Sequence, residues 1–148
     1  MRVLIDTCVV MDAIQEREPF RESAQKIMLA AATRTFDGFL TAKAAADIHY
    51  LLHRHTHDNS ETRKLLSKLF ALLDLLDTTG NDCRQALSSS ISDYEDAIMA
   101  ETAFRTGMDC IVTRNEKDYR NAPVSVYSPA EFLQILSAAA ATQDETDM

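Results

Sequence analysis

Several aspartates in this chain stand where an apolar segment ends or where a helical segment begins, and carboxylates in such places can act together. Asp6 comes directly after the apolar run 3–5, which is typical of a short buried strand. An unpaired buried carboxylate is unfavourable, so Asp6 must be neutralised, paired or bound to a metal. The other acids in comparable positions are Asp47, Asp93, Asp96 and Asp118.

Carboxylates that lie within a few ångströms of one another repel, and a divalent cation relieves that repulsion. Ligation by oxygen alone favours Mg²⁺ or Mn²⁺ over metals that prefer sulfur or imidazole. Such ions can activate a water molecule and stabilise the leaving oxygen of a phosphodiester. If the aspartates converge, we therefore expect them to bind Mg²⁺ or Mn²⁺.

The aspartates can converge only if the segments that carry them meet at one edge of a sheet. Strand-like and helix-like segments alternate along the chain, which predicts an α/β fold with a parallel sheet covered on both faces. We expect the run 3–5 to lie in the middle of this sheet. The carboxyl ends of parallel strands carry the chemistry in such sheets, and Asp6 falls at one of them. The expected strands are 3–5, 36–40, 75–76, 110–113 and 124–126, and the expected helices are 8–17, 21–33, 42–55, 60–73, 81–87, 93–107 and 128–136.

Composition indicates one domain in a reducing compartment. The 148 residues are 46% hydrophobic, and the three cysteines show no CxxC spacing, so we expect a cytoplasmic protein without disulfides. No signal peptide and no membrane partner are expected from the sequence pattern. We expect a domain over residues 1–136 and a flexible acidic tail over 137–148.

The net charge of −8 is unusual for a protein that binds phosphate groups. A carboxylate site, however, repels phosphate without metal and attracts it when metal is bound. An acidic surface would also suit a basic protein partner. The charge alone therefore leaves nucleic acid and protein partners open.

Five segments, in this order, resemble the PIN-domain nucleases, and in detail the bacterial branch related to VapC-type toxins. They extend from Met1 to about Leu136 and read LIDTCVVMD, AKAAADIHYLL, DYEDAIMAETA, IVTRNEKDY and VYSPAEFL. The resemblance implies a three-layer α/β/α fold with a mostly parallel sheet of about five strands. It also implies a Mg²⁺- or Mn²⁺-dependent endoribonuclease, which would be the toxin of a toxin–antitoxin pair, with a small antitoxin partner and a homodimeric state.

The resemblance also assigns the catalytic acids residue by residue. The first acid of the family is Asp6, the second, often glutamate, is Asp47, and the third is Asp96. The fourth acid normally follows a threonine and an arginine, and that position is Asn115 here. Asp118, three residues later, is the expected substitute.

Further residues near these acids receive supporting roles from the same resemblance. The expected metal ligands are Asp6, Asp96 and Asp118, with Asp93 joining them, although Asp93 could instead be a plain helix N-cap. Thr113, Asn115 and Thr7 are the expected auxiliary residues, with the two hydroxyl groups near the metal-bound water. Cys8 stands where the family often has asparagine.

Three basic residues flank the expected site and could contact RNA: Arg114, Lys117 and Arg120. They could equally pair with neighbouring acids such as Glu116 and Asp118. Further basic residues that could meet a substrate are Arg2, Arg54, Arg63 and Lys64.

Two alternatives to the ribonuclease remain open. Cys8 and Asn115 depart from the family pattern, which favours a catalytically weakened PIN-fold module that binds RNA or protein. A small-molecule phosphohydrolase would share the aspartate at the strand end. Such an enzyme usually has a second aspartate two residues later, and Cys8 occupies that position.

Overall fold

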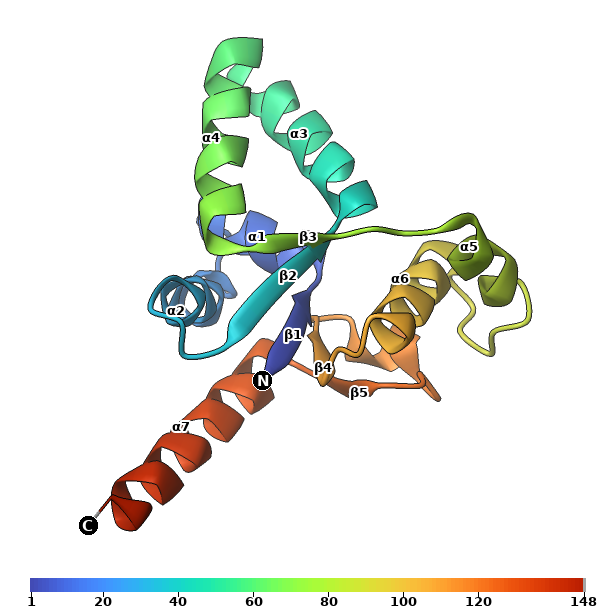
Figure 1. The fold of residues 1–148 in the computed structure, drawn as a ribbon. Coiled ribbons are helices and arrows are strands. Elements are labelled where there is room, and N and C mark those ends of the chain that lie inside the picture. Colours follow the sequence, from blue (N-terminus) through green and yellow to red (C-terminus); the bar gives the residue numbers. More distant parts are fainter. Residues whose placement is uncertain (148) are drawn as a thin grey trace.

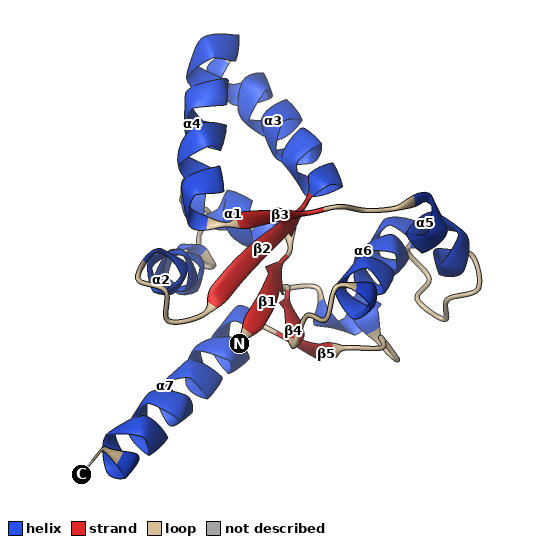
Figure 2. Ribbon diagram, viewed as in Figure 1, coloured by secondary structure: helices blue, strands red, loops and turns tan. Residues whose placement is uncertain are grey.

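Five parallel strands form one sheet with the first strand at its centre (Figures 1 and 2). The computed structural model describes residues 1–147, and the strand order in the sheet is β3-β2-β1-β4-β5. The central place expected for the first strand is therefore confirmed. The strands are β1 (Arg2–Ile5), β2 (Asp37–Thr41), β3 (Asp74–Leu76), β4 (Cys110–Val112) and β5 (Ser125–Tyr127).

Helices cover both faces of this sheet, so the architecture is the expected three-layer α/β/α fold (Figure 2). Each expected helix is present, and apart from the end of α7 the ends are displaced by at most a few residues. Side-chain caps account for several starts: Thr41, Asp58 and Asp93 each accept a bond from a backbone N–H in the first turn. The helices are α1 (Thr7–Ile14), α2 (Arg21–Ala32), α3 (Ala42–Thr56), α4 (Asn59–Leu72), α5 (Gly80–Ala86), α6 (Tyr94–Arg105) and α7 (Pro129–Thr146).

The alternation of side chains along β1 divides the core between the two faces. Val3 and Ile5 are fully buried against α1, α2 and α7 on one face, and Leu4 is buried against α6 on the other. Because successive side chains of a strand point to opposite faces, a continuous apolar run is what a strand buried on both faces requires. This burial holds the end of β1, and with it Asp6, in a fixed place.

One local expectation is wrong, and one short element was not predicted. Helix α7 runs to Thr146 rather than ending near residue 136, so it passes through most of the expected tail. Its extension contains the alanine-rich run 138–141, which has high helix propensity although residues 137–147 are exposed. The final residue of the expected tail, 148, lies outside the described residues. The short 3₁₀ helix η1 (Glu116–Tyr119) was not expected, because four residues carry too little periodicity.

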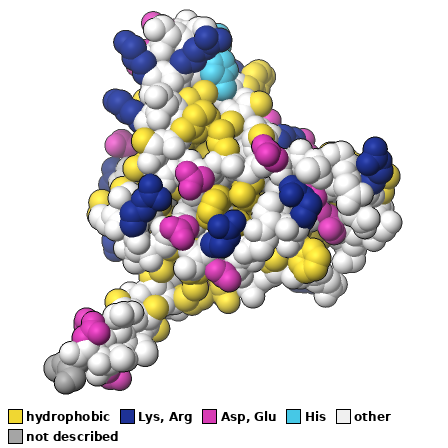
Figure 3. Space-filling view, in the orientation of Figure 1, with side chains coloured by type: hydrophobic (Ala, Val, Ile, Leu, Met, Phe, Trp, Pro, Cys, Tyr) yellow, Lys and Arg dark blue, Asp and Glu magenta, His cyan; other side chains and the backbone are white. Residues whose placement is uncertain are grey.

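The surface carries both signs of charge (Figure 3). Helices α3 and α4 form a pair that projects from the sheet, and basic side chains with a histidine gather at its tip (Figures 1 and 3). Within residues 1–147, every helix is too short or too polar to cross a lipid bilayer.

Candidate active site

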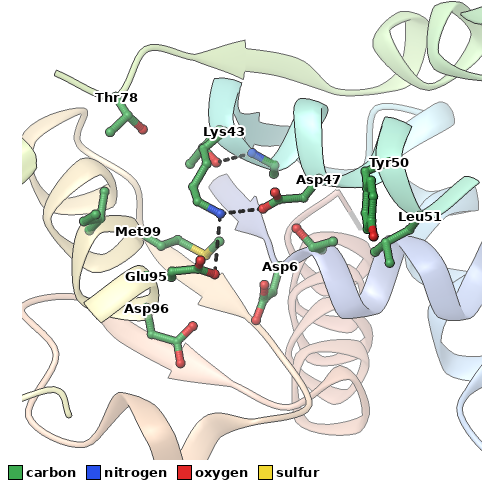
Figure 4. Close-up of a pocket in the computed structure, with 13 residues that line it drawn as sticks. Asp6, Lys43, Asp47, Tyr50, Leu51, Thr78, Glu95, Asp96 and Met99 are labelled. Carbon is green, nitrogen blue, oxygen red and sulfur yellow. Dashed lines mark hydrogen bonds and ion pairs between the residues drawn. The ribbon is translucent and has the colours of Figure 1, made fainter. Parts of the chain in front are cut away.

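A cavity of about 300 Å³ opens where β1 and β2 end and α3 and α6 begin (Figure 4). Three of the four expected catalytic acids line it: Asp6 from the end of β1, Asp47 from α3 and Asp96 from α6. Parallel strands bring their carboxyl ends to one edge, so acids that are distant in sequence share this cavity. The remaining lining residues are Thr7, Thr41, Lys43, Ala44, Tyr50, Leu51, Thr78, Glu95, Ile98 and Met99.

Asp6 is the most buried of these acids, with 8% of its surface exposed. Its backbone N–H donates to the carbonyl of Val112 at 3.0 Å, which continues the pairing of β1 with β4. The Thr113 hydroxyl donates to Asp6 Oδ2 at 2.7 Å. Burial raises the pKa of Asp6 because it disfavours the charged form, and the bond from Thr113 opposes that rise.

Asp96 lies in the first turn of α6 and is held by Tyr119 of η1. The Tyr119 hydroxyl donates to Asp96 Oδ1 at 3.0 Å. Burial raises the pKa of Asp96 to about 6; the Tyr119 bond lowers it, and the charges of Asp93, Asp6 and Asp118 add to the rise. The sequence analysis did not select Tyr119 as a site residue, because an aromatic residue after a polar loop is most simply explained as part of the core. The structure buries Tyr119.

Asp47 shares its part of the cavity with two charged residues that the sequence analysis did not select (Figure 4). Lys43 Nζ lies 2.6 Å from Asp47 Oδ2 and 3.4 Å from Glu95 Oε2, so it joins α3 to α6. Burial alone would lower the pKa of Lys43, but these two carboxylates outweigh it and raise the pKa. The four-residue spacing of Lys43 and Asp47 was a usable signal for their pair.

The other expected site residues have more varied positions. Thr113 is buried, and it accepts a bond from the Asn115 N–H at 3.1 Å while donating to Asp6. Asp118 is exposed on η1 and is not among the described residues that line the cavity, although its charge acts on Asp96.

The Asp93 carboxylate caps α6 by accepting from the Asp96 N–H at 3.0 Å. The Cys8 sulfur lies 3.8 Å from the Thr113 hydroxyl oxygen.

Arg114 is turned toward the protein and pairs with an acid of α1. Its Nε lies 2.8 Å from Oδ2 of Asp12, and its guanidinium carbon lies 4.2 Å above the ring centroid of Phe20. Asp12 is only 1% exposed, and Arg17 lies 3.9 Å from its other oxygen. Lys117 and Arg120 are exposed on η1 and just after it. Of the three expected RNA contacts, Arg114 therefore has a structural partner.

The donor set of the cavity fits a hard divalent cation in chemistry. Asp6 and Asp96 face the same space, and their donor atoms are carboxylate oxygens. Burial raises the pKa of each, and the charge of Asp6 adds to the rise at Asp96, so a bound cation would offset the cost of holding both in the charged form. Within residues 1–147, however, no three His, Cys, Asp or Glu side chains form a group already arranged to hold a metal. Asp47 forms an ion pair with the Lys43 ammonium.

Comparison with known proteins adds a family and several structural neighbours. The family model described as PIN domain matches residues 2–117. A toxin–antitoxin complex from Klebsiella pneumoniae contains a chain with a TM-score of 0.64 at 20% identity, covering 86% of this chain and 97% of that one. FitAcB from Neisseria gonorrhoeae gives 0.63 at 19% identity, covering 86% and 97%.

The description of a third similar structure states what that protein cleaves. Mycobacterium tuberculosis VapC20, described as a Sarcin-Ricin loop cleaving toxin, gives a TM-score of 0.57 at 12% identity and covers 74% of this chain and 86% of that chain. At these identities the neighbours establish the fold. No curated protein matches the chain in sequence.

Proposed function

This chain belongs to the PIN-domain family, and from that premise we propose that it is a metal-dependent endoribonuclease that hydrolyses RNA phosphodiester bonds. One observation carries the proposal: Asp6, Asp47 and Asp96, from three separate elements, line one cavity at the carboxyl edge of the sheet. VapC20, which has a similar fold, is described as a Sarcin-Ricin loop cleaving toxin.

In this proposal Asp6 and Asp96 hold Mg²⁺ or Mn²⁺, with Asp47 and Asp118 completing the acidic set. When bound, such an ion supplies activation of water and stabilisation of the leaving oxygen. The chain's own residues orient the ligands: Thr113 fixes the carboxylate of Asp6, and Tyr119 fixes that of Asp96. Lys43 offsets one of the two negative charges of Asp47 and Glu95, which reduces the repulsion that a phosphate would meet.

The test compares the protein with its Asp6→Asn variant on structured and unstructured RNA, with Mn²⁺ and with EDTA. We expect the unaltered protein to cleave RNA with Mn²⁺ but not with EDTA, and the Asp6→Asn variant to cleave RNA in neither condition. Asp74→Asn is the matched control, because it makes the same change at an exposed position at the amino end of β3 and should leave cleavage unaffected. Cleavage that persists in EDTA, or in the Asp6→Asn variant, would exclude the metal mechanism.

A catalytically weakened PIN-fold module that binds RNA or protein is the second candidate. It is favoured by the Lys43 ammonium beside Asp47 and by the lack of a preformed three-ligand group among residues 1–147. Cys8 and Asn115 add to it as departures from the family pattern. In the same experiment this module would bind RNA or a partner and cleave nothing under any condition.

We also infer that this chain acts in the cytoplasm as a toxin with a small protein antitoxin. The inference rests on its family and on its similarity to a chain of the Klebsiella pneumoniae toxin–antitoxin complex. A short reading frame upstream of the gene, whose product co-purifies with this chain, would support it. The homodimer implied by the resemblance is tested by light scattering of the purified protein, where a monomer at all concentrations would contradict it.

A further inference from the structure

One face of α3 carries an aromatic and a cationic side chain directly beyond the carboxylate cavity. Tyr50 is 63% exposed, although it lines the cavity beside Asp47 (Figure 4). The guanidinium carbon of Arg54 lies 5.8 Å from the ring centroid of Tyr50. Residues three or four apart share a helix face, so Asp47, Tyr50 and Arg54 form one stripe along α3. We call these three residues the α3 stripe.

A second hollow of about 250 Å³ continues the α3 stripe away from the cavity. Arg54, Arg17 and His55 line it, and Leu51 lines both hollows and so lies between them. Beyond it, exposed basic residues gather where α3 ends and α4 begins (Figure 3). They are Arg54, His55, His57, Arg63 and Lys64. The exposed acids Asp58 and Glu61 lie in the same stretch, so its excess of positive charge rests on Arg54, Arg63 and Lys64.

An exposed tyrosine ring between carboxylates and guanidinium groups matches the chemistry of an unpaired nucleotide. Bases stack on aromatic side chains and on guanidinium planes, and arginine binds phosphate. Asp47 and Arg54 are separated by about 10 Å along the helix axis, given a rise of 1.5 Å per residue. That separation is on the scale of a nucleotide, so one base and the following phosphate can lie along the stripe.

We propose that the α3 stripe binds the unpaired nucleotide next to the scissile phosphate, with its base on Tyr50 and its phosphate on Arg54. The substrate class is then single-stranded RNA, because a base inside a duplex is already stacked and paired. The statement that this phosphate is cleaved rests on the function proposed above. The binding of an unpaired base to Tyr50 does not depend on cleavage and can be measured separately.

The test measures binding of a fluorescent unstructured oligoadenylate and of a blunt RNA duplex to the Asp6→Asn protein with Mg²⁺, because the carboxylate site repels phosphate without metal. Into this background we place Tyr50→Ala, Tyr50→Phe and Phe104→Ala. Phe104 is a matched control, since it is 61% exposed on α6 and lies outside the lining of the cavity. Tyr50→Ala should lower the affinity for the single-stranded RNA about tenfold, which is the contribution of one stacked base. Tyr50→Phe and Phe104→Ala should leave the affinity for the single strand within about twofold. None of these three variants should alter the affinity for the duplex.

Arg54→Ala tests the phosphate end of the stripe. It should weaken both RNAs and lower the slope of log affinity against log salt by about one. Arg84→Ala, an exposed arginine of α5, is its control and should leave the slope unchanged. The proposal is overturned if Tyr50→Ala binds the single strand as Phe104→Ala does, if Tyr50→Ala weakens binding of the single strand and of the duplex equally, or if the protein binds neither RNA.

Cleavage assays of the same substitutions without Asp6→Asn separate this proposal from the proposed function. Where the chain cleaves RNA, Tyr50→Ala should raise KM and leave kcat nearly unchanged, because it removes substrate binding rather than an interaction specific to the transition state. Cleavage with an unaffected KM would reject the stripe and keep the nuclease. Tyr50-dependent binding without any cleavage would keep the stripe and reject the nuclease.

Discussion

The hydroxyl of Thr113 donates to Oδ2 of Asp6 at 2.7 Å, across 107 residues of sequence. Both side chains are buried at the adjoining ends of β1 and β4. The same Thr113 oxygen accepts the Asn115 N–H at 3.1 Å, so one hydroxyl links the buried carboxylate to the start of the following loop. The orientation of Asp6 therefore depends on how the loop after β4 is held.

Replacing Thr113 by valine should impair catalysis and stability together. Valine keeps the shape of the side chain but leaves a buried oxygen of Asp6 without its donor, which we expect to cost about 1–3 kcal/mol of unfolding free energy. The Mn²⁺ concentration for half-maximal cleavage should rise about tenfold or more, as for other groups that orient metal ligands. Thr113→Ser retains the hydroxyl and should restore most of the metal affinity. Equal metal dependence in the valine and serine variants would contradict this role.

Asp96→Asn should stabilise the metal-free protein at pH 7.5. In the folded state the pKa of Asp96 is raised from 3.8 to about 6, so the folded state holds its proton more tightly than the unfolded state. Stability is therefore lost as the pH rises from the unfolded pKa through the folded one, and asparagine removes that loss. Melting temperatures in EDTA should show a gain at pH 7.5 that shrinks toward pH 4. A constant gain at all pH values would contradict it, and Asp74→Asn controls for the change of residue type.

The pair Asp82–Arg105 should give the opposite pH dependence. Arg105 Nε lies 2.8 Å from Asp82 Oδ1, and burial alone would raise the Asp82 pKa, but the bonds from Arg105 and Thr79 lower it. The stability that this carboxylate confers is present above its ordinary pKa of 3.8 and is lost as the pH falls through the lower folded value.

Asp82→Asn should therefore destabilise the protein by about 1–3 kcal/mol at pH 7 in urea denaturation. The difference from the unaltered protein should narrow below pH 3.8, where the carboxylate becomes protonated. RNA binding should stay unchanged, because Asp82 lies outside the lining of the cavity. A variant as stable as the unaltered protein at pH 7 would show that the pair contributes little.

Arg114 and Lys117 should differ in what their removal affects. Arg114→Ala leaves the buried Asp12 with only the more distant Arg17, so we expect a loss of about 3 kcal/mol in unfolding free energy. Lys117 is exposed, and Lys117→Ala should leave stability within about 0.5 kcal/mol. If Lys117 contacts RNA, Lys117→Ala lowers the slope of log RNA affinity against log salt concentration by about one. Denaturation and RNA binding measured on both variants check this, and a stable Arg114→Ala protein would contradict it.

The order and type of the helices and strands could be read from the sequence because their signals are local. The run 3–5 is apolar on both faces, and Ser128-Pro129 with Glu131 is a capping box that the structure contains. The convergence of acids on one edge was an expectation from parallel topology, and the structure places Asp6, Asp47 and Asp96 around one cavity. Their catalytic roles remain predictions.

Only the tertiary structure decided which partners these acids have. The four-residue spacing signals the pair of Lys43 with Asp47, but Lys43 also reaches Glu95 because α3 and α6 both begin at the carboxyl edge of the sheet, and no local pattern reveals that second contact. Tyr119 reaches Asp96 through a single 3₁₀ turn, and Arg114 turns to Asp12 rather than to solvent. The physical reason is range: periodicity and capping act within a few residues, whereas a hydrogen bond across the fold depends on how whole elements pack.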